Sequence, residues 1–148
     1  MKQFDIKYTD NYEELKELFI KNGLEVGNEP VPTEMIKCWK VTLEDNGREI
    51  MVGGATLGLR AGEYVVDGIA IEPQYRDCDI GTEMLEKLVD YAKEIGVKKL
   101  WLVAIAPGFF KKNGFTAVER DDAPYIFGCF NCEKYGKECK PEVMRMDL

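Results

Sequence analysis

The chain has 148 residues, of which 45% are hydrophobic and 32% are charged, and this composition predicts one globular domain over residues 1–148. Its formal net charge is −7, which argues against nucleic-acid binding because that requires a basic face. No apolar run approaches the ~20 residues of a membrane helix, and the N-terminal residues lack the apolar segment of a secretory signal. We therefore expect a cytoplasmic protein that binds neither nucleic acid nor a membrane.

The reactive side chains are limited by five cysteines and the absence of histidine. An odd number of cysteines without an export signal predicts reduced thiols and no disulfide framework. The missing histidine excludes Ser–His and Cys–His nucleophilic machinery and removes the commonest metal ligand. Any proton transfer must therefore use carboxylates, tyrosines, lysines, thiols or water.

The first half of the chain predicts a strand, a helix and a long hairpin. Residues 3–9 are typical of a strand, and an amphipathic helix follows with Asp10 as its N-cap. The pair Asn46-Gly47 separates two runs of alternating hydrophobicity, which predicts a hairpin over residues 37–60. Arg60, Ala61 and Gly62 are predicted to form the next turn.

The second half adds further strands and helices, so that we expect a mixed α/β fold with one mixed sheet flanked by helices. The last strand lies in a cysteine-containing tail, residues 121–148. In chain order the elements are a strand over 63–73, a helix over 79–96, an apolar strand over 97–106, a short helix over 107–114, and strands over 115–120 and 142–148.

The stretch "IAIEPQYRDCDIGTEMLEKLVDYA", residues 69–92, runs from an apolar strand through a proline into an amphipathic helix. A helix N-terminus presents unpaired backbone N–H groups and a partial positive charge, so this turn is suited to an anion such as phosphate. Neither the dinucleotide motif nor the ATP-type loop is present. What remains is the spacing Arg76-x-x-Asp79-x-Gly81.

This stretch and the later "FFKKNGF" resemble the GNAT superfamily of acyl-CoA-dependent N-acetyltransferases, and the order of elements matches across nearly the whole chain. The resemblance implies the GNAT fold, a mixed and splayed β-sheet flanked by helices, with the thioester at the fork between two strands. It implies acetyl-CoA as co-substrate and direct acetyl transfer to a primary amine, on a small molecule or a protein. It also leaves room for a homodimer that pairs through edge strands.

In that family the turn binds the diphosphate of coenzyme A through backbone amides, and the preceding strand pairs with the pantetheine arm. Asp79 stands where the family has its first motif glycine, and a carboxylate ~4 Å from a phosphate oxygen is repelled by ~1 kcal/mol in water-like surroundings. Alternatively, Asp77 or Asp79 caps the helix or adopts left-handed backbone angles, which aspartate tolerates. The cofactor-binding residues implied are Ile69, Ala70, Ile71, Arg76, Asp77, Cys78, Asp79, Ile80, Gly81 and Thr82.

The family often places a glutamate on a splayed strand and a tyrosine in the short helix, where this chain has Val103 and Phe110. The substitutes are Asp67 as base and Tyr125 as acid, with Tyr64 ranked second as acid, and we take Asp67 and Tyr125 as the catalytic candidates. The ordinary alternatives are a charge facing water and a packed aromatic ring. Proximity and an oxyanion contact alone supply much of the acceleration in a direct transfer. The rival function is a degenerate module that binds coenzyme A, a metal or a partner without catalysis.

The tail carries the cluster Cys129-x2-Cys132-x6-Cys139. Two thiolates at Cys-x2-Cys spacing form half of a zinc site, and Cys139 offers a third ligand. A fourth ligand would have to be Cys38 or Cys78 through space, a carboxylate such as Glu133, or water. We rank simple packing of small apolar side chains first, zinc second, and a redox pair of Cys129 and Cys132 third.

Overall fold

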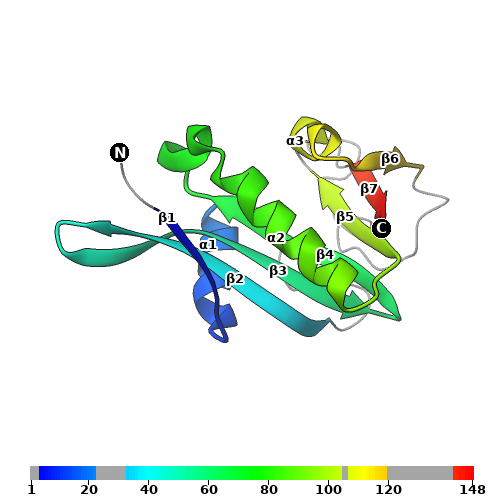
Figure 1. The fold of residues 1–148 in the computed structure, drawn as a ribbon, viewed down its shortest axis with the longest axis horizontal. Coiled ribbons are helices and arrows are strands. Elements are labelled where there is room, and N and C mark those ends of the chain that lie inside the picture. The colour runs from blue at the N-terminus through cyan, green and yellow to red at the C-terminus, as the bar shows by residue number, and fades with distance from the viewer. Residues whose placement is uncertain (1–3, 23–32, 105–106, 120–141) are drawn as a thin grey trace.

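The computed structural model describes residues 4–22, 33–104, 107–119 and 142–148, with the backbone alone described for Asp77 and Cys78. The described strands form one seven-stranded sheet in the order β1-β2-β3-β4-β5-β7-β6 (Figure 1). The elements are β1 (Phe4–Tyr8), α1 (Tyr12–Lys21), β2 (Glu34–Asp45), β3 (Arg48–Arg60), β4 (Glu63–Ile71), the 3₁₀ helix η1 (Pro73–Cys78), α2 (Ile80–Glu94), β5 (Lys99–Ala104), α3 (Pro107–Lys112), β6 (Thr116–Val118) and β7 (Glu142–Asp147).

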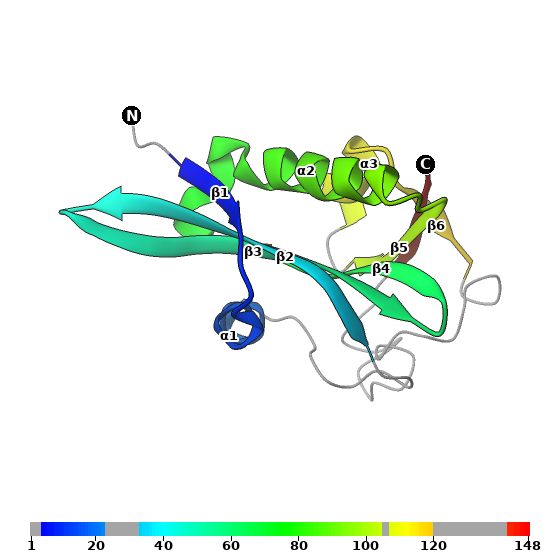
Figure 2. The same cartoon turned by 60° about the horizontal axis from the view of Figure 1, so that its bottom comes forward.

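The two longer helices cover opposite faces of the sheet, with α2 above and α1 below in Figure 2. The predicted apolar stripe of α2 is confirmed for Met84, Leu85 and Leu88, which are buried in the same core cluster as Leu57 of β3. Ile95, expected on the same face, is 41% exposed. On the other face, α1 buries its own apolar stripe. Such one-sided helices are stable because their apolar faces leave water against the sheet. Among the described residues, no helix combines the length and the apolarity needed to cross a bilayer.

The start of α1 differs from the prediction. Asn11, and not Asp10, is the N-cap, because the side chain of Asn11 accepts a hydrogen bond from the N–H of Glu14 at 3.3 Å. The backbone N–H of Asn11 in turn donates to the hydroxyl of Thr9. Both residue types are good N-caps, so composition alone did not separate two adjacent candidates.

Both predicted turns of the β2–β3–β4 meander are confirmed. Asn46 and Gly47 have φ of 52° and 77°, and Ala61 and Gly62 have φ of 48° and 84°. Two consecutive left-handed residues match the twist of the flanking strands in a two-residue hairpin.

The sheet is splayed between β4 and β5, as expected. β4 pairs with β3 along its length, but its parallel pairing with β5 is confined to Tyr64 with Leu100 and Val65 with Trp101. Beyond Val65 the two strands diverge, while β5 remains fully paired with β7 on its other side. The carboxyl ends of β4 and β5 therefore border a fork in the sheet.

The contact between α1 and β4 leaves no room for a side chain at Gly68, and a substitution there tests this packing. A Cβ added at Gly68 would lie 2.6 Å from Cε2 of Phe19, which is itself 1% exposed. We predict that Gly68→Ala lowers the free energy of unfolding by about 1–3 kcal/mol, the usual range for overpacking a core. Urea denaturation followed by circular dichroism measures this change.

The matched control is Gly108→Ala in α3, where nothing lies within 4 Å of the added Cβ. This variant should be neutral or slightly more stable, since alanine is the better helix former. Equal losses at the two glycines would show that the packing of α1 on β4 is not what excludes a side chain at Gly68.

Candidate functional site

The turn between β4 and α2 is a single turn of 3₁₀ helix that ends in a left-handed residue. Pro73 begins η1, and Asp79 follows it with φ of 58° and ψ of 15°. The left-handed angles expected for Asp79 are therefore confirmed. Its carboxylate makes no capping hydrogen bond to α2, so the alternative that Asp79 caps the helix through its side chain is wrong. The side chain of Asp77 lies outside the described residues.

The first turn of α2 therefore presents backbone N–H groups that the Asp79 side chain does not occupy. Intrahelical bonding starts with the N–H of Glu83, which donates to the carbonyl of Asp79 at 3.2 Å. The preceding N–H groups, of Ile80, Gly81 and Thr82, belong to the set that has no partner within a helix. These groups can bind an anion together with the positive end of the helix dipole.

Gly81 brings the turn next to the open end of the fork. A Cβ at this position would lie 3.3 Å from Cζ of Phe109 in α3 and 3.8 Å from Cγ1 of Ile71 at the end of β4. The start of α2, the end of β4 and the helix that follows β5 therefore meet in one place. A ligand with an anionic group and an extended arm fits this arrangement, with the anion on α2 and the arm along β4.

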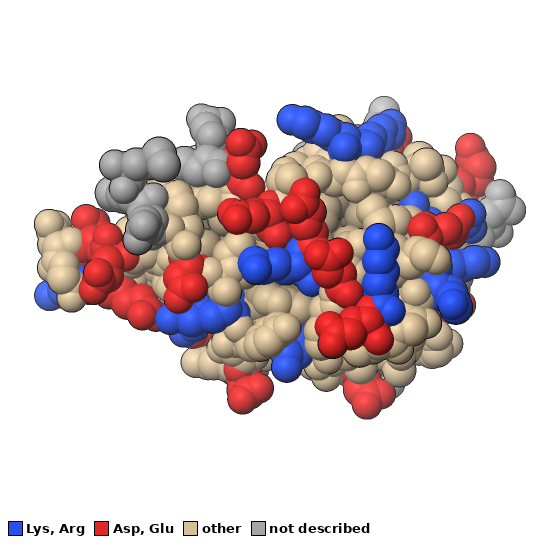
Figure 3. All heavy atoms as spheres, viewed as in Figure 1, with Lys and Arg blue, Asp and Glu red and all other residues tan. Residues whose placement is uncertain are grey.

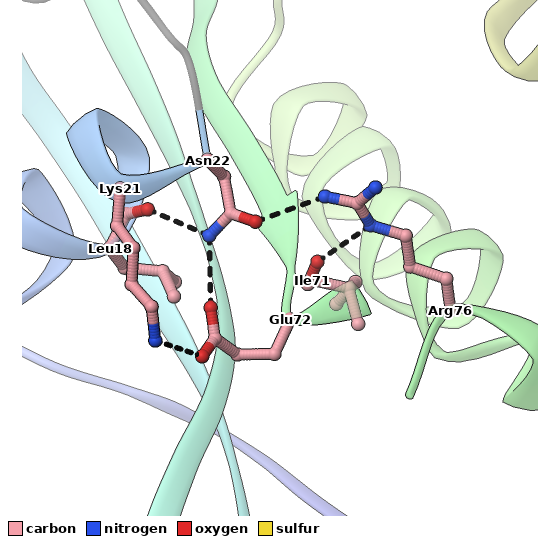
Figure 4. Close-up of polar contacts among 6 residues, drawn as sticks. All are labelled: Leu18, Lys21, Asn22, Ile71, Glu72 and Arg76. Atoms are coloured by element: carbon pink, nitrogen blue, oxygen red, sulfur yellow. Dashed lines mark hydrogen bonds and ion pairs between the residues drawn. The ribbon is translucent and has the colours of Figure 1, made fainter. Parts of the chain in front are cut away.

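A polar network fixes the turn to the end of α1 (Figure 4). Glu72 is the residue between β4 and η1, and its carboxylate accepts hydrogen bonds from Lys21 Nζ at 2.6 Å and Asn22 Nδ2 at 3.0 Å. Glu72 is 9% exposed. The hydrogen bonds from Lys21 and Asn22 lower the pKa of Glu72 below its ordinary value of 4.5, although burial opposes this shift.

Arg76 takes part in the same network. Its Nε donates to the carbonyl of Ile71 at 2.9 Å, and its Nη2 donates to Oδ1 of Asn22 at 3.0 Å. The sequence predicted Arg76 as a ligand of the diphosphate. In the structure its guanidinium is turned toward the end of β4 and toward α1 (Figure 4), and its contact with a diphosphate stays a prediction. Two of its five N–H donors are used in holding the turn.

The surface around α2 is not basic. Acidic side chains follow the exposed face of this helix, with lysines between them (Figure 3). The acids are Glu83, Glu86, Asp90 and Glu94. An anion at the turn therefore depends on the backbone N–H groups and the helix dipole more than on surrounding cations.

A separate hollow of about 500 Å³ lies at the other end of α2, against β1. Its lining includes Tyr8, Trp39 and Tyr91, whose rings contact one another edge-on or tilted. Asp90 and Glu94 are at its rim. Because the turn is at the N-terminal end of α2, this hollow is distinct from the fork.

Asp67, the predicted base, is part of a buried ion pair. Thr56 of β3 pairs with Gly68 and Leu57 pairs with Val66, which leaves Asp67 as the extra residue of a β-bulge. The side chain of Asp67 is 6% exposed and forms an ion pair with Nη2 of Arg60. Bulges often re-aim a side chain beside an active site.

Arg60 itself is held in place, because its Nε donates to Oγ1 of Thr33 at 2.6 Å. The predicted acid, Tyr125, lies outside the described residues, as do Cys129, Cys132 and Cys139.

In α3, Phe110 is buried and its ring contacts those of Phe109 and Phe115. It supplies packing at the position where the resemblance implies a tyrosine.

Sequence reasoning missed Lys21, Asn22 and Glu72. Glu72 lies directly before Pro73 and reads as an ordinary acidic residue at the end of a strand. Its partners lie 51 and 50 residues away, so no local pattern marks them. The indole Nε1–H of Trp101 likewise donates to the carboxylate of Glu63 at a separation of 38 residues.

The sequence of residues 9–115 matches a family model described as Acetyltransferase (GNAT) family. An amino-acid acetyltransferase of Enterobacter sp. (strain 638) is 30% identical over 81 residues, which are 54% of this chain and 17% of that protein. An uncharacterized N-acetyltransferase of Chlorobaculum tepidum is 28% identical over 71 residues, which are 47% of this chain and 46% of that protein. The matched segment thus spans less than half the length of these curated relatives.

Solved structures show the same fold. An acetyltransferase of the GNAT family from Staphylococcus aureus Mu50 superimposes with a TM-score of 0.69 at 19% identity, covering 99% of both chains. The N-acetylglutamate synthase of Neisseria gonorrhoeae, complexed with coenzyme A and N-acetyl-glutamate, has a TM-score of 0.63 at 18% identity. That superposition covers 99% of this chain and 35% of the synthase.

The lowered pKa of Glu72 predicts a specific dependence of stability on pH. A carboxyl group whose pKa is lower in the folded state stabilises the fold fully above its unfolded value. This stabilisation is lost as the pH falls through the folded value, which lies below 4.5. The difference in unfolding free energy between the wild type and Glu72→Gln should therefore be constant above about pH 5.5 and shrink below about pH 4.5.

Urea denaturation at a series of pH values measures this difference. Glu17→Gln is the matched control because Glu17 is on the exposed side of the same helix as Lys21, and its curve should follow that of the wild type. A Glu72→Gln curve parallel to the wild type down to pH 3 would argue against an ionised Glu72 in the folded network.

Proposed function

The chain belongs to the GNAT family of acetyltransferases, and we propose that it transfers an acetyl group from acetyl-CoA to a primary amine by direct attack. The observation that carries this proposal is the fork between β4 and β5, which opens beside an α2 N-terminus that the Asp79 side chain leaves uncapped. An amino group of a small molecule or of a protein serves as acceptor. The names of the relatives, which include an amino-acid acetyltransferase, support the first of these two classes.

The chain offers backbone groups for three parts of acetyl-CoA, namely the diphosphate, the pantetheine arm and the thioester oxygen. The N–H groups of Ile80, Gly81 and Thr82 bind the diphosphate, and the edge of β4 from Ile69 to Ile71, which β5 leaves unpaired, binds the pantetheine amides. A β4 N–H at the fork stabilises the negative charge that develops on the thioester oxygen. Acetyl-CoA itself supplies the activated acyl group.

The transfer forms a C–N bond and breaks the C–S bond of the thioester. The acceptor must attack as the uncharged amine, and we assign the removal of its proton to Asp67, with water as carrier. Tyr125 then protonates the departing thiolate of coenzyme A, and the proton that the nitrogen loses on forming the amide returns through water to the tyrosinate. Holding the amine against the thioester contributes much of the acceleration, since orientation alone is worth several kcal/mol in such reactions.

A second candidate is a coenzyme A-binding module without catalysis. It is favoured by Phe110, a buried ring where the family often has a tyrosine, and by the carboxylate of Asp79 at the mouth of the anion site. Binding of coenzyme A without turnover of acetyl-CoA in the presence of any amine would support this candidate.

The first test is stabilisation by the ligand. At 1 mM coenzyme A and a dissociation constant of about 100 μM, mass action adds about 1.4 kcal/mol to the free energy of unfolding. For a chain of this size the melting temperature should rise by about 3–5 °C, as thermal shift measures. ATP is the control, because it carries a similar charge without a pantetheine arm and should give a smaller rise. No rise at millimolar coenzyme A would contradict the proposal.

The second test separates the charge of Asp79 from its backbone conformation. Asp79→Asn removes the charge and keeps a residue that tolerates left-handed angles, and Asp79→Gly removes both side chain and charge. We predict that both variants bind coenzyme A about five times more tightly, the factor that ~1 kcal/mol of repulsion implies. Isothermal titration calorimetry measures the dissociation constants.

Asp90→Asn is the matched control for this test. Asp90 is also an exposed acid on α2, but it lies eleven residues from Asp79, beyond the reach of screened charges at physiological salt. The affinity of Asp90→Asn for coenzyme A should equal that of the wild type. Weaker binding by both Asp79 variants would instead place the carboxylate among the groups that hold the ligand.

A further inference from the structure

Asn22 joins the ends of three elements at the candidate site (Figure 4). It is the C-cap of α1, and its amide nitrogen donates to the carbonyl of Leu18 at 2.9 Å and to Glu72 Oε1 at 3.0 Å. Its amide oxygen accepts from Arg76 Nη2 at 3.0 Å. Glu72 directly follows the strand β4 and Arg76 belongs to the 3₁₀ turn, so one side chain links the end of the helix to the junction of strand and turn.

The bonds of Asn22 require an amide. Its partner Glu72 is an acceptor and its partner Arg76 is a donor, so the bridging side chain must donate on one side and accept on the other. A carboxylate at this position would face the carboxylate of Glu72, and an apolar residue would leave both partners without the bridge. Asparagine satisfies both while its side chain remains short enough to cap α1.

Other contacts fix both ends of the Asn22 bridge, one at the turn and one at α1. Arg76 Nε donates to the carbonyl of Ile71 at 2.9 Å, which closes the turn on the last residue of β4. On the far side, α1 is fixed to the sheet because the ring of Phe19 fills the space above Gly68. The turn is therefore positioned by a helix that is itself seated on the strand beside the fork.

We propose that Asn22 is a positioning residue for the diphosphate of coenzyme A: it holds Arg76 against Ile71 and thereby sets where the N–H groups of Ile80 to Thr82 lie relative to β4. The inference rests on the proposed binding of coenzyme A at this turn. Arg76 then acts through the turn, and the backbone of α2 makes the contact with the diphosphate. In this way α1, which lies on the opposite face of the sheet from α2, influences the affinity for coenzyme A at the start of α2.

The test compares coenzyme A with pantetheine, which lacks the diphosphate. Asn22→Ala should raise the dissociation constant for coenzyme A about tenfold, measured by calorimetry, and leave the weak binding of pantetheine, followed by NMR titration, unchanged. Glu17→Ala, on the exposed side of α1, is the control and should bind both ligands as the wild type does.

A second pair of variants exchanges donor and acceptor. Asn22→Asp alone places two carboxylates together and should weaken coenzyme A binding at least as much as Asn22→Ala. Asn22→Asp combined with Glu72→Gln restores a donor facing an acceptor, and leaves an acceptor for Arg76. We expect the double variant to bind coenzyme A within about threefold of the wild type. This comparison decides the matter even if Asn22→Ala does not fold.

Three results would overturn the inference. Wild-type affinity in Asn22→Ala would show that the bridge does not position the turn. Equally weakened binding of coenzyme A and of pantetheine would show a general loss of structure. A double variant that binds coenzyme A no more tightly than Asn22→Asp would show the same. If the wild type itself does not bind coenzyme A, the proposed function fails together with this inference, whereas a binding wild type and an unaffected Asn22→Ala refute the inference alone.

Discussion

The early end of the β4–β5 ladder is the constraint on which the arrangement of the site depends. After Val65 and Trp101 the two strands no longer share hydrogen bonds, so the edge of β4 that faces the fork loses its partner from the sheet. Buried backbone groups rarely remain without a partner, and an extended ligand with amides of its own is one way to provide it. The fork is stable because each strand keeps its other neighbour, β3 for β4 and β7 for β5.

The turn that follows β4 resolves a conflict between charge and conformation. It needs a left-handed residue before α2, and aspartate accepts such angles at lower cost than most residues other than glycine. The same carboxylate then stands beside the proposed site for anions. Since its side chain makes no capping hydrogen bond to α2, Asp79 does not occupy the helix N–H groups, and its unfavourable charge lies at the edge of the proposed site.

Features with local signals could be predicted from the sequence. The Asn46-Gly47 turn, the apolar face of α2 and the left-handed Asp79 each follow from the chemistry of a few neighbouring residues. The splayed sheet followed from a resemblance carried by motif residues, and the anion-binding role of the turn stays a prediction. The choice of Asn11 as the N-cap of α1 was missed because Asp10 beside it is equally suited.

The network of Glu72, Lys21, Asn22 and Arg76 could not have been predicted. Its members form two local pairs, Lys21 with Asn22 and Glu72 with Arg76, but these two pairs meet only because Phe19 seats α1 over Gly68. The partner of Asp67 was missed for a related reason. Arg60 was read as a turn residue, while the bulge in β4 aims Asp67 toward it. In both cases the fold, and not the local pattern, selects the partners.

The pairing of Arg60 with Asp67 limits how the proposed base can act. Both side chains are almost fully buried, at 5% and 6% exposure, and removing the charge of one partner leaves the other buried without compensation, which costs several kcal/mol. A proton that stayed on Asp67 would have this effect on Arg60. The carboxylate of Asp67 therefore suits a role in which it orients a water molecule. That water carries the proton from the amine to solvent, and the carboxylate stabilises the positive charge in transit. Acceleration would come chiefly from the placement of the amine against the thioester, and so from the backbone geometry of the fork.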